Sequence, residues 1–147
     1  MGERFLTNSV YAGFPLNREQ MAQTVDLLLT SPIGRIYVAE RKGDVVGMIG
    51  GLLFRHPITG EATVSELFWW VEPEHRGIGI RLLKRAEQWA EEVGAVRMHM
   101  VAPTTDVGQM YLRLGYSPLE TTYQKALSCS PQEPPSPSPL LPAPAEV

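Results

Sequence analysis

The apolar pattern of the chain changes period at Pro73, and no other feature constrains the fold as strongly. Residues 61–71 are rich in β-branched and aromatic side chains, which is typical of a strand. Beyond Pro73 the apolar residues recur at helical spacing and form one face: Leu82, Ala86, Trp89 and Val93. An amphipathic helix that directly follows a strand must bury its apolar face on another layer, so we predict a sheet covered by helices.

The N-terminal half of the chain predicts one helix and two further strands. A helix is expected over residues 18–30, because Asn17 and Gln20 resemble a capping box. Strands are expected over residues 35–40 and 45–54, separated by a tight Lys-Gly-Asp turn. Together with the strand that follows, they predict antiparallel hairpins.

The C-terminal half predicts a strand, a short helix and a closing strand or hairpin. Residues 96–100 alternate as a strand does, and Asp106 can cap a short helix that ends at Gly115. Residues 116–126 are expected to close the domain. The order αβββαβαβ predicts an α/β fold of the α+β kind, with a mixed, mostly antiparallel central sheet flanked by helices.

The composition divides the chain into a folded domain and a tail. A chain of 147 residues has room for one domain, which we expect over residues 1–127. Residues 128–147 are dominated by proline, serine and alanine, which predicts a disordered tail. Its PxxP-like spacings could dock an SH3-type groove, but an inert tail is the favoured interpretation. The single cysteine, Cys129, cannot pair within the chain, which fits a reducing compartment.

The charge balance and the hydropathy argue against several functions. A net charge of -3 and a pI near 5.6 argue against nucleic-acid binding. The N-terminus lacks the pattern of a secretory signal, and no run approaches the ~18 apolar residues of a membrane span. We therefore expect a cytoplasmic protein with no membrane association. Three histidines and one cysteine predict no metal site.

The segment after the strand over residues 61–71 has the residues of an anion site. Glycines let the backbone approach a ligand closely, and the first amides of a helix lack intrahelical partners. Such a site suits the pyrophosphate of a nucleotide cofactor, with Arg76 and Arg81 adding positive charge. A P-loop is excluded because Gly79 is followed by Ile80 in place of lysine. A dinucleotide fingerprint is excluded because its third glycine is absent and the surrounding order is antiparallel.

Two segments resemble the GNAT superfamily of N-acetyltransferases. The first is Val-Glu-Pro at 71–73, followed by Arg76 and Gly79, which is similar to the family signature Arg/Gln-x-x-Gly-x-Gly/Ala between a strand and a helix. The second is Met-Tyr-Leu-Arg-Leu-Gly-Tyr at 110–116, which resembles the family element Y-x-x-x-G-F/Y. The two segments stand in the family's order and at its usual separation, and the resemblance spans about residues 33–127.

The resemblance implies a GNAT-like fold and acetyl-CoA as co-substrate. It also implies the cofactor-binding residues, which are Val71, Arg76, Gly77, Ile78, Gly79, Ile80 and Arg81. The family prefers a small residue at the position of Arg81, where a positive charge could instead clamp phosphate. The segment before Asn17 leaves little room for the family's usual first strand and first helix, so the sheet could be one strand short and an acceptor-site wall could be missing.

Glu66 and Tyr111 are the candidate catalytic residues. Strict alternation places Glu66 on the face of Val64, Phe68 and Trp70, where burial would raise its pKa and suit a general base. Some GNAT enzymes are similar in carrying a base glutamate a few residues before V-x-P. Alternatively, Glu66 pairs with a cation or lies at a solvent-facing bulge. The resemblance implies that the Tyr111 hydroxyl protonates the departing thiolate; alternatively, Tyr111 is a packed aromatic whose hydroxyl finds a partner.

The sequence thus predicts an N-acetyltransferase that passes an acetyl group from acetyl-CoA to a primary amine by direct attack in a ternary complex. The acceptor is expected to be a small-molecule or peptide amine, and no residue identifies it. The alternative is a non-catalytic acyl-CoA-binding or protein-interaction module, which the short N-terminus favours and Tyr111 disfavours. Whether the protein forms a homodimer is left open.

Overall fold

The computed structural model describes residues 2–127, and the proline-rich segment with Cys129 lies outside the described residues. The chain divides into two units, Met1–Tyr116 and Ser117–Val147, and every described helix and strand belongs to the first. In chain order the elements are α1 (Gly2–Thr7), α2 (Arg18–Thr30), β1 (Gly34–Arg41), β2 (Asp44–Arg55), β3 (Ala62–Val71), η1 (Pro73–Ile78), α3 (Gly79–Glu92), β4 (Arg97–His99) and α4 (Thr105–Arg113).

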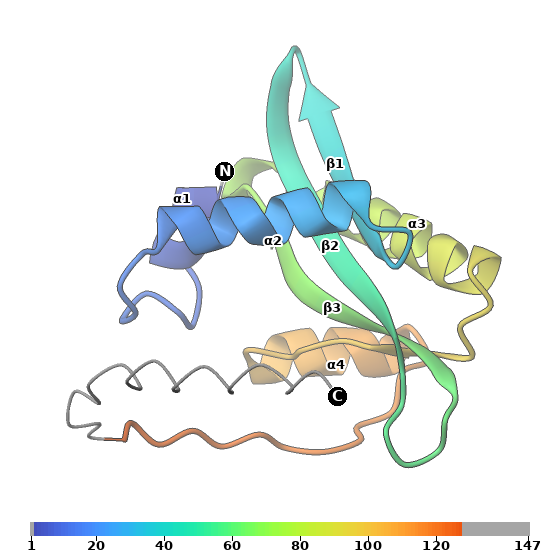
Figure 1. Cartoon of the computed structure of the whole chain (residues 1–147). Helices are drawn as coiled ribbons and strands as arrows, with labels where there is room; N and C mark the ends of the chain where they lie inside the picture. Colours follow the sequence, from blue (N-terminus) through green and yellow to red (C-terminus); the bar gives the residue numbers. More distant parts are fainter. Residues whose placement is uncertain (1, 128–147) are drawn as a thin grey trace, which may run out of the picture. The chain divides into compact units, whose positions relative to one another are not determined.

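The four strands form one mixed sheet in the order β1-β2-β3-β4 (Figure 1). β2 is antiparallel to both of its neighbours, whereas β4 is parallel to β3. This arrangement confirms the fold class expected from the sequence, a mostly antiparallel sheet flanked by helices. It also means that the C-terminal ends of β1 and β3 lie at the same end of the sheet, because both strands run opposite to β2.

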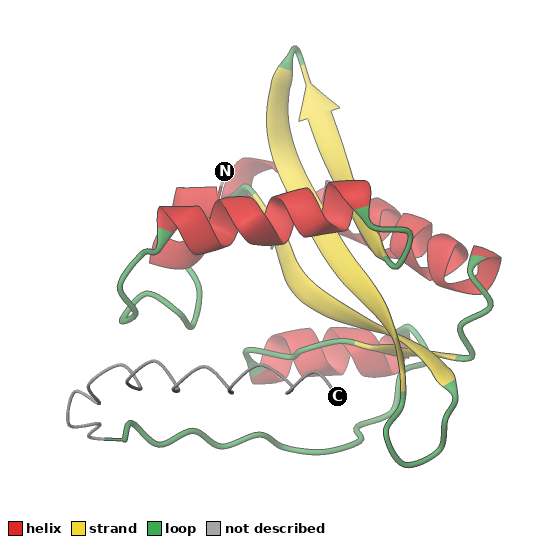
Figure 2. Ribbon diagram, in the orientation of Figure 1, coloured by secondary structure: helices red, strands yellow, loops and turns green. Residues whose placement is uncertain are grey.

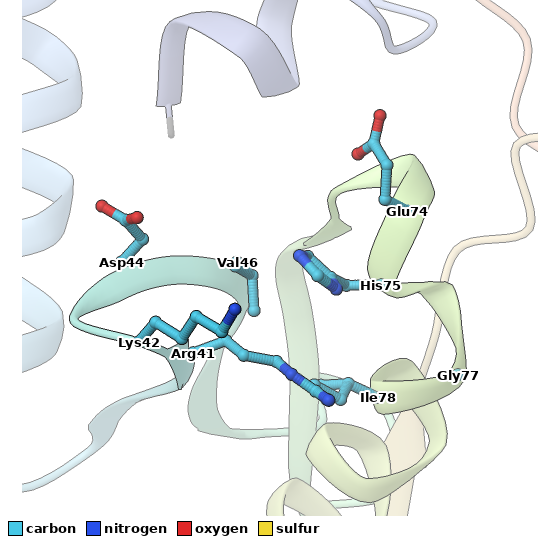
Figure 3. Close-up of a pocket in the computed structure, with 8 residues that line it drawn as sticks. All are labelled: Arg41, Lys42, Asp44, Val46, Glu74, His75, Gly77 and Ile78. Atoms are coloured by element: carbon cyan, nitrogen blue, oxygen red, sulfur yellow. The ribbon is translucent and has the colours of Figure 1, made fainter.

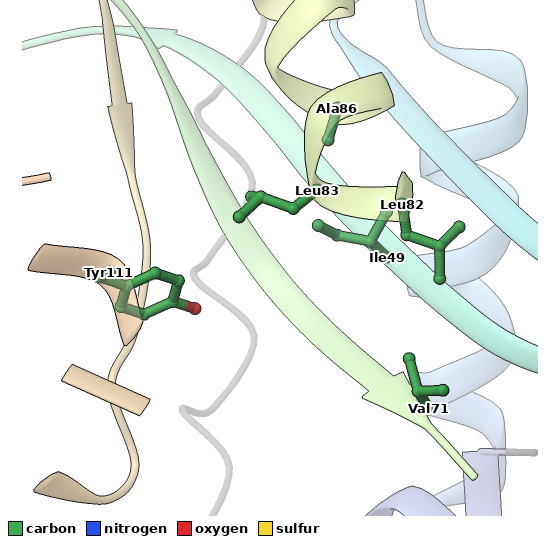
Figure 4. Close-up of a cluster of buried hydrophobic side chains, with 6 residues drawn as sticks. All are labelled: Ile49, Val71, Leu82, Leu83, Ala86 and Tyr111. Atoms are coloured by element: carbon green, nitrogen blue, oxygen red, sulfur yellow. The ribbon is translucent and has the colours of Figure 1, made fainter. Parts of the chain in front are cut away.

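Helices cover both faces of the sheet, with α2 on one face and α3 on the other (Figure 2). On the α2 face, Leu28 is buried against Gly34 of β1. The main core lies between α3, the sheet and α4 (Figure 4) and contains Ile49, Val71, Leu82, Leu83, Ala86 and Tyr111. A second cluster joins Val64 to the far end of α3 through Trp89. The amphipathic face predicted from the helical spacing after Pro73 is therefore the face that α3 buries.

The predicted helix over residues 18–30 and the three long strands are confirmed within one or two residues. α2 is capped as expected, with the Asn17 side-chain oxygen accepting from the Gln20 amide at 2.9 Å. Both signals are local, since a cap and a strand alternation depend on residues close in sequence.

One helix was not predicted, and two local expectations were wrong. Residues 2–7 form α1, which is too short for a periodic apolar pattern to predict it. The hydroxyl of Thr104 accepts from the Val107 amide and caps α4, so Asp106 lies in the first turn and is not the cap. Residues 116–126, all of which the structure describes, form no strand or hairpin. Pro118 lacks an amide donor for a ladder, which is a local reason for the absence of a strand.

Candidate active site

The separation of β3 and β4 defines the candidate site. β4 pairs with β3 only from Thr63 to Ser65. Over residues 66–71, the edge of β3 that faces β4 has no ladder partner within the described chain. The N–H and C=O groups on such an edge can pair with an extended ligand as they would with an added strand.

A β-bulge at Leu67 changes the orientation of Glu66. Gly50 pairs with Phe68 and Gly51 pairs with Glu66, so Leu67 has no partner in β2. One extra residue reverses the alternation of side chains beyond it. Strict alternation along β3, as expected from the sequence, was therefore wrong across the bulge.

The bulge separates Glu66 from the aromatic residues that follow it. Gly51, the β2 partner of Glu66, faces Val64 and the Trp89 ring of α3. The Trp69 ring lies against Gly79 at the start of α3, so Glu66, Val64 and Trp69 share the face of the sheet that α3 covers. Phe68 and Trp70 lie on the opposite face, where both rings pack against α1. The expected grouping of Glu66 with these two rings is corrected accordingly.

Glu66 and Tyr111 meet at the backbone of Val101. The Val101 amide donates to Glu66 Oε2 at 3.1 Å, and the Tyr111 hydroxyl donates to the Val101 carbonyl at 3.3 Å. Val101 follows β4 at the point where the chain leaves the sheet. The structure thus brings the two candidate catalytic residues together beside the separation of β3 and β4. Val101 was not predicted, because it contributes through its backbone and its side chain gives no signal.

Burial determines the protonation of both groups. Burial raises the pKa of the Glu66 carboxyl, and the hydrogen bond from Val101 offsets part of this rise. Burial, and then the charge of Glu66, raise the pKa of the Tyr111 hydroxyl well above its usual range. Tyr111 therefore keeps its proton at neutral pH, as a general acid must, and Glu66 is a stronger base than an exposed carboxylate.

Aromatic packing holds Tyr111 in place. Its ring stacks on Trp69 with the centroids 6.1 Å apart, and the ring of Tyr116 lies 5.3 Å away. The Tyr116 hydroxyl donates to Glu87 of α3 at 2.6 Å, which ties the end of α4 to that helix. The buried indole N–H of Trp69 has no partner in the described structure. The indole N–H groups of Trp70 and Trp89 are buried without a described partner as well, so this feature does not mark a site.

The segment predicted as a glycine loop is helical. η1 is a 3₁₀ helix that starts at Pro73 and continues directly into α3 at Gly79. The Gly79 amide donates to the Arg76 carbonyl, so this amide is not free for a ligand. No side chain caps α3 at Ile78. The positive end of the α3 dipole lies at the end of the sheet where β3 finishes. The site therefore depends on the dipole and on fewer free amides than the sequence suggested.

The two glycines of this segment have different surroundings. A side chain at Gly77 would meet no atom within 4 Å. A side chain at Gly79 would lie 3.2 Å from the Trp69 ring and 3.5 Å from Val71. Gly79 thus lets α3 approach β3 closely, which is a packing role, while Gly77 keeps open space beside the backbone.

The remaining predicted cofactor residues lie around the same turn. The guanidinium of Arg76 lies 5.7 Å from the centre of the Trp70 ring, on the face of β3 opposite to Trp69. Arg81 is exposed in the first turn of α3, while Ile78 and Ile80 are partly buried. Both arginines are exposed, as side chains that meet a phosphate from solvent would be.

An open pocket of about 680 Å³ adjoins this segment (Figure 3). The last residue of β1 and the turn after it contribute one cation each, Arg41 and Lys42, and the guanidinium of Arg41 reaches toward η1. The lining residues are Arg41, Lys42, Asp44, Val46, Glu74, His75, Gly77 and Ile78. Sequence reasoning missed these cations. They could have been predicted from the direction of the strands, because the C-terminal ends of β1 and β3 lie at the same end of the sheet.

The three histidines lie at two separate places. Among the described residues, no group of three or more His, Cys, Asp or Glu side chains could hold a metal ion. His75 lines the pocket, and His99 packs its ring near those of Phe54 and His56. No helix in the described part of the chain is long and apolar enough to cross a membrane.

These features fit a long ligand with a diphosphate and an extended amide arm. The uncapped start of α3, the open space at Gly77 and two exposed arginines suit the diphosphate. The edge of β3 over residues 66–71, which has no ladder partner within the described chain, suits the amide arm.

The sequence profile described as the acetyltransferase (GNAT) family matches residues 6–116. The chain belongs to the GNAT acetyltransferase family. Both segments that resemble GNAT signatures lie within the matched residues, as does the separation of β3 and β4. No curated protein sequence matches the chain.

Solved structures show the same GNAT fold. A transcriptional regulator from Bacillus halodurans C-125 is 15% identical, with a TM-score of 0.71 over 84% of this chain and 89% of that chain. A ribosomal-protein-alanine N-acetyltransferase from Brucella melitensis is 21% identical, with a TM-score of 0.61 over 84% and 89%. An aminoglycoside N-acetyltransferase in complex with CoA is 19% identical, with a TM-score of 0.61 over 76% and 88%. At these identities the likeness to solved structures shows the fold alone. Membership of the GNAT acetyltransferase family supports acyl transfer as the kind of reaction.

Proposed function

We propose that this GNAT chain transfers the acetyl group of acetyl-CoA to a primary amine by direct attack in a ternary complex. The observation that carries the proposal is the meeting of Glu66 and Tyr111 at the Val101 backbone. It puts a carboxyl of raised pKa and a protonated hydroxyl beside the one stretch of β3 that lacks a partner in the described chain.

The chain's own residues would hold acetyl-CoA at two places. The start of α3, with Arg76, Gly77, Ile78, Ile80 and Arg81, would bind the diphosphate through the helix dipole, free amides and guanidinium groups. The edge of β3 down to Val71 would pair with the amide arm, and its backbone would polarise the thioester carbonyl. Gly79 would act through packing, because it lets α3 approach β3.

The two candidate catalytic residues would move protons in opposite directions. Glu66, directly or through a water, would take a proton from the acceptor ammonium, and the amine nitrogen would then attack the thioester carbon. The carbon–sulfur bond breaks as the amide forms, and Tyr111 would give its proton to the departing sulfur. As the amide forms, its nitrogen loses a second proton, which restores that of Tyr111, and Glu66 releases the proton it took to water. The enzyme is then unchanged, and the products are the amide, the free thiol and one proton.

A second candidate is a non-catalytic acyl-CoA-binding module. It is favoured by one specific observation, that both Glu66 and Tyr111 already have hydrogen-bond partners in Val101. A side chain whose only role is to brace the chain beyond β4 would make the same contacts.

The test combines binding with turnover. Calorimetry with acetyl-CoA measures binding, and free thiol release with a panel of primary amines measures transfer. We expect binding together with amine-dependent thiol release. Binding without release to any amine would favour the binding module, and absence of binding would contradict both candidates.

A further inference from the structure

A buried carboxylate lies at the start of the segment that would contact the diphosphate. Glu72 directly follows β3, and it is the one charged residue that is buried in the described part of the chain. Its amide donates to the Val46 carbonyl at 2.9 Å, and its carbonyl accepts from the His75 amide at 2.9 Å. The backbone of Glu72 is therefore fixed by β2 on one side and by η1 on the other.

The charge of Glu72 opposes the binding of a diphosphate at η1 and the start of α3. A 3₁₀ helix rises about 2 Å per residue, so the Glu72 backbone lies within roughly 10 Å of the Gly77 backbone. Solvent and salt screen a buried charge less than an exposed one over such a distance. A carboxylate here competes with a phosphate for the positive end of the α3 dipole. Without a counter-charge, Glu72 would weaken the site.

Helix α1 supplies the counter-charge. Arg4 Nε lies 3.2 Å from Glu72 Oε1, and no other cation among residues 2–127 lies within 4 Å of this carboxylate. The side chain of Glu72 is only 12% exposed, whereas that of Arg4 is 62% exposed. The ion pair thus joins a buried negative charge to a positive charge at the surface.

Aromatic contacts hold α1 beside η1. The ring of Phe5, the residue after Arg4, lies 6.4 Å from the ring of Trp70. The guanidinium of Arg76 in η1 lies 5.7 Å from the centre of the same Trp70 ring. Trp70 is therefore contacted by α1 and by the predicted phosphate-binding segment, and these contacts keep Arg4 at Glu72.

We propose that Arg4 is a positioning residue for the cofactor, which neutralises Glu72 and so leaves a positive potential at η1 for the diphosphate of acetyl-CoA. This inference rests on the proposed function, because it concerns the ligand of the same site. Arg4 lies outside residues 6–116, which match the GNAT family profile, and outside both GNAT-like segments. It acts through Glu72 and needs no contact with the ligand.

The test is a double-mutant cycle on Arg4 and Glu72, with the acetyl-CoA dissociation constant measured by calorimetry. Arg4→Ala should weaken binding roughly fivefold, because it leaves a buried carboxylate near the diphosphate. The double variant Arg4→Ala with Glu72→Gln should bind within twofold of the wild type, since no charge then remains to be neutralised. Arg18→Ala removes the other ion pair of α1, with Glu3, and is the matched control that should bind within twofold.

A second ligand separates the electrostatic role from a structural one. S-acetylpantetheine carries the amide arm and the thioester but no diphosphate, and its affinity can be measured by displacement of acetyl-CoA in the same calorimeter. Arg4→Ala should leave this affinity within twofold of the wild type. If Arg4→Ala fails to fold in a thermal melt, Arg4→Gln removes the charge while keeping much of the side chain, and the same results are expected of it.

The outcomes distinguish this inference from the proposed function. Unchanged acetyl-CoA affinity in Arg4→Ala, equal weakening of both ligands, or a double variant as weak as Arg4→Ala would overturn the role of Arg4 and leave acetyl transfer intact. Absence of acetyl-CoA binding by the wild type would overturn both.

Discussion

The two halves of β3 differ more in their surroundings than in their composition. In the first half, Thr63 and Val64 are 0% exposed and pair with β2 on one edge and β4 on the other. The second half, residues 66–71, pairs only with β2 within the described chain and carries the bulge at Leu67, which is 42% exposed. Both halves contain β-branched or aromatic residues, so β-propensity does not distinguish them.

The difference shows how one strand can serve stability and chemistry at once. Pairing on both edges satisfies the backbone and buries the side chains, so the first half holds α3 on the sheet through Val64 and Trp89. An unpaired edge leaves backbone groups available to a ligand, and it lies next to Glu66 and Tyr111. We therefore expect substitutions in the first half to affect folding and substitutions around the second half to affect turnover.

The largest expected effect is on Glu66. We predict that Glu66→Gln lowers kcat by about 10²–10⁴-fold, the usual contribution of a general base, because an amide oxygen can still accept from Val101 but cannot take a proton. The wild-type rate should fall on acidification at a pH above the usual carboxyl range, since burial raises the pKa of Glu66, and the variant should lack this fall.

Stability provides the control for Glu66→Gln. Because the pKa of Glu66 is higher in the folded state than in the unfolded state, its protonated form favours folding. This stability is lost as the pH rises through the folded-state pKa. The variant should therefore be as stable as the wild type, or slightly more stable, at pH 8 in a thermal melt. A clearly lower melting temperature with kcat retained would show a bracing role instead.

A similar loss of turnover is expected for Tyr111→Phe. Removing the hydroxyl should lower kcat by about 10²–10⁴-fold and spare acetyl-CoA affinity, because the ring still packs on Trp69. The lost hydrogen bond to Val101 should cost about 1 kcal/mol of unfolding free energy.

Tyr116→Phe is the matched control for Tyr111→Phe. It removes the hydroxyl of a ring that packs against Tyr111. That hydroxyl donates to Glu87, whereas the Tyr111 hydroxyl donates to Val101. It should cost a similar unfolding free energy in urea titrations and keep kcat within threefold or so, since it does not touch the reacting groups. Equal losses of kcat in the two variants would mean that Tyr111 acts only through packing.

The paired half should show the opposite balance. Val64→Ala removes two methylene equivalents from a site with 0% exposure and should cost about 2 kcal/mol of unfolding free energy. Its kcat should stay within twofold of the wild type. Leu67→Ala, at the exposed bulge, should change the unfolding free energy by less than about 0.5 kcal/mol. If Leu67→Ala were the more destabilising change in urea, the comparison of the two halves would be wrong.

A smaller effect is expected at the start of α3. Gly77→Val should weaken acetyl-CoA binding roughly tenfold by filling the open space beside the backbone, with the melting temperature unchanged. Gly79→Val should weaken binding and also lower the melting temperature, because its side chain would press on Trp69. Calorimetry and a melt of both variants distinguish the two glycines, and an unchanged affinity in Gly77→Val would mean that η1 is not part of the binding site.

The smallest effect is expected from removing residues 128–147. This segment is rich in proline and serine and has few residues to bury, so a chain that ends at Leu127 should keep its melting temperature and its acetyl-CoA affinity. The deletion leaves both halves of β3 untouched. A melting temperature lowered by several degrees would place the domain boundary beyond Leu127.

Local signals determined much of this fold and of its family. The cap at Asn17, the strand alternation and the amphipathic face of α3 each depend on residues within a few positions of one another. The two GNAT-like segments are also short runs of residues close in sequence, and their order along the chain is enough to indicate the family. The sequence therefore predicted the order of the strands and α-helices from Arg18 to Gly115, the fold class and the candidates Glu66 and Tyr111.

Only the tertiary structure decided how those candidates are oriented. The bulge at Leu67 arises from pairing with β2, and it moved Glu66 away from Phe68 and Trp70 to the face of Trp69. Glu66 and Tyr111 are linked through hydrogen bonds to the backbone of Val101. A backbone contact does not depend on the side chain at that position, so the amino-acid sequence gives no sign of it. Register, bulges and backbone contacts depend on partners far away in sequence, and each shift by one residue turns a side chain to the other face of the sheet.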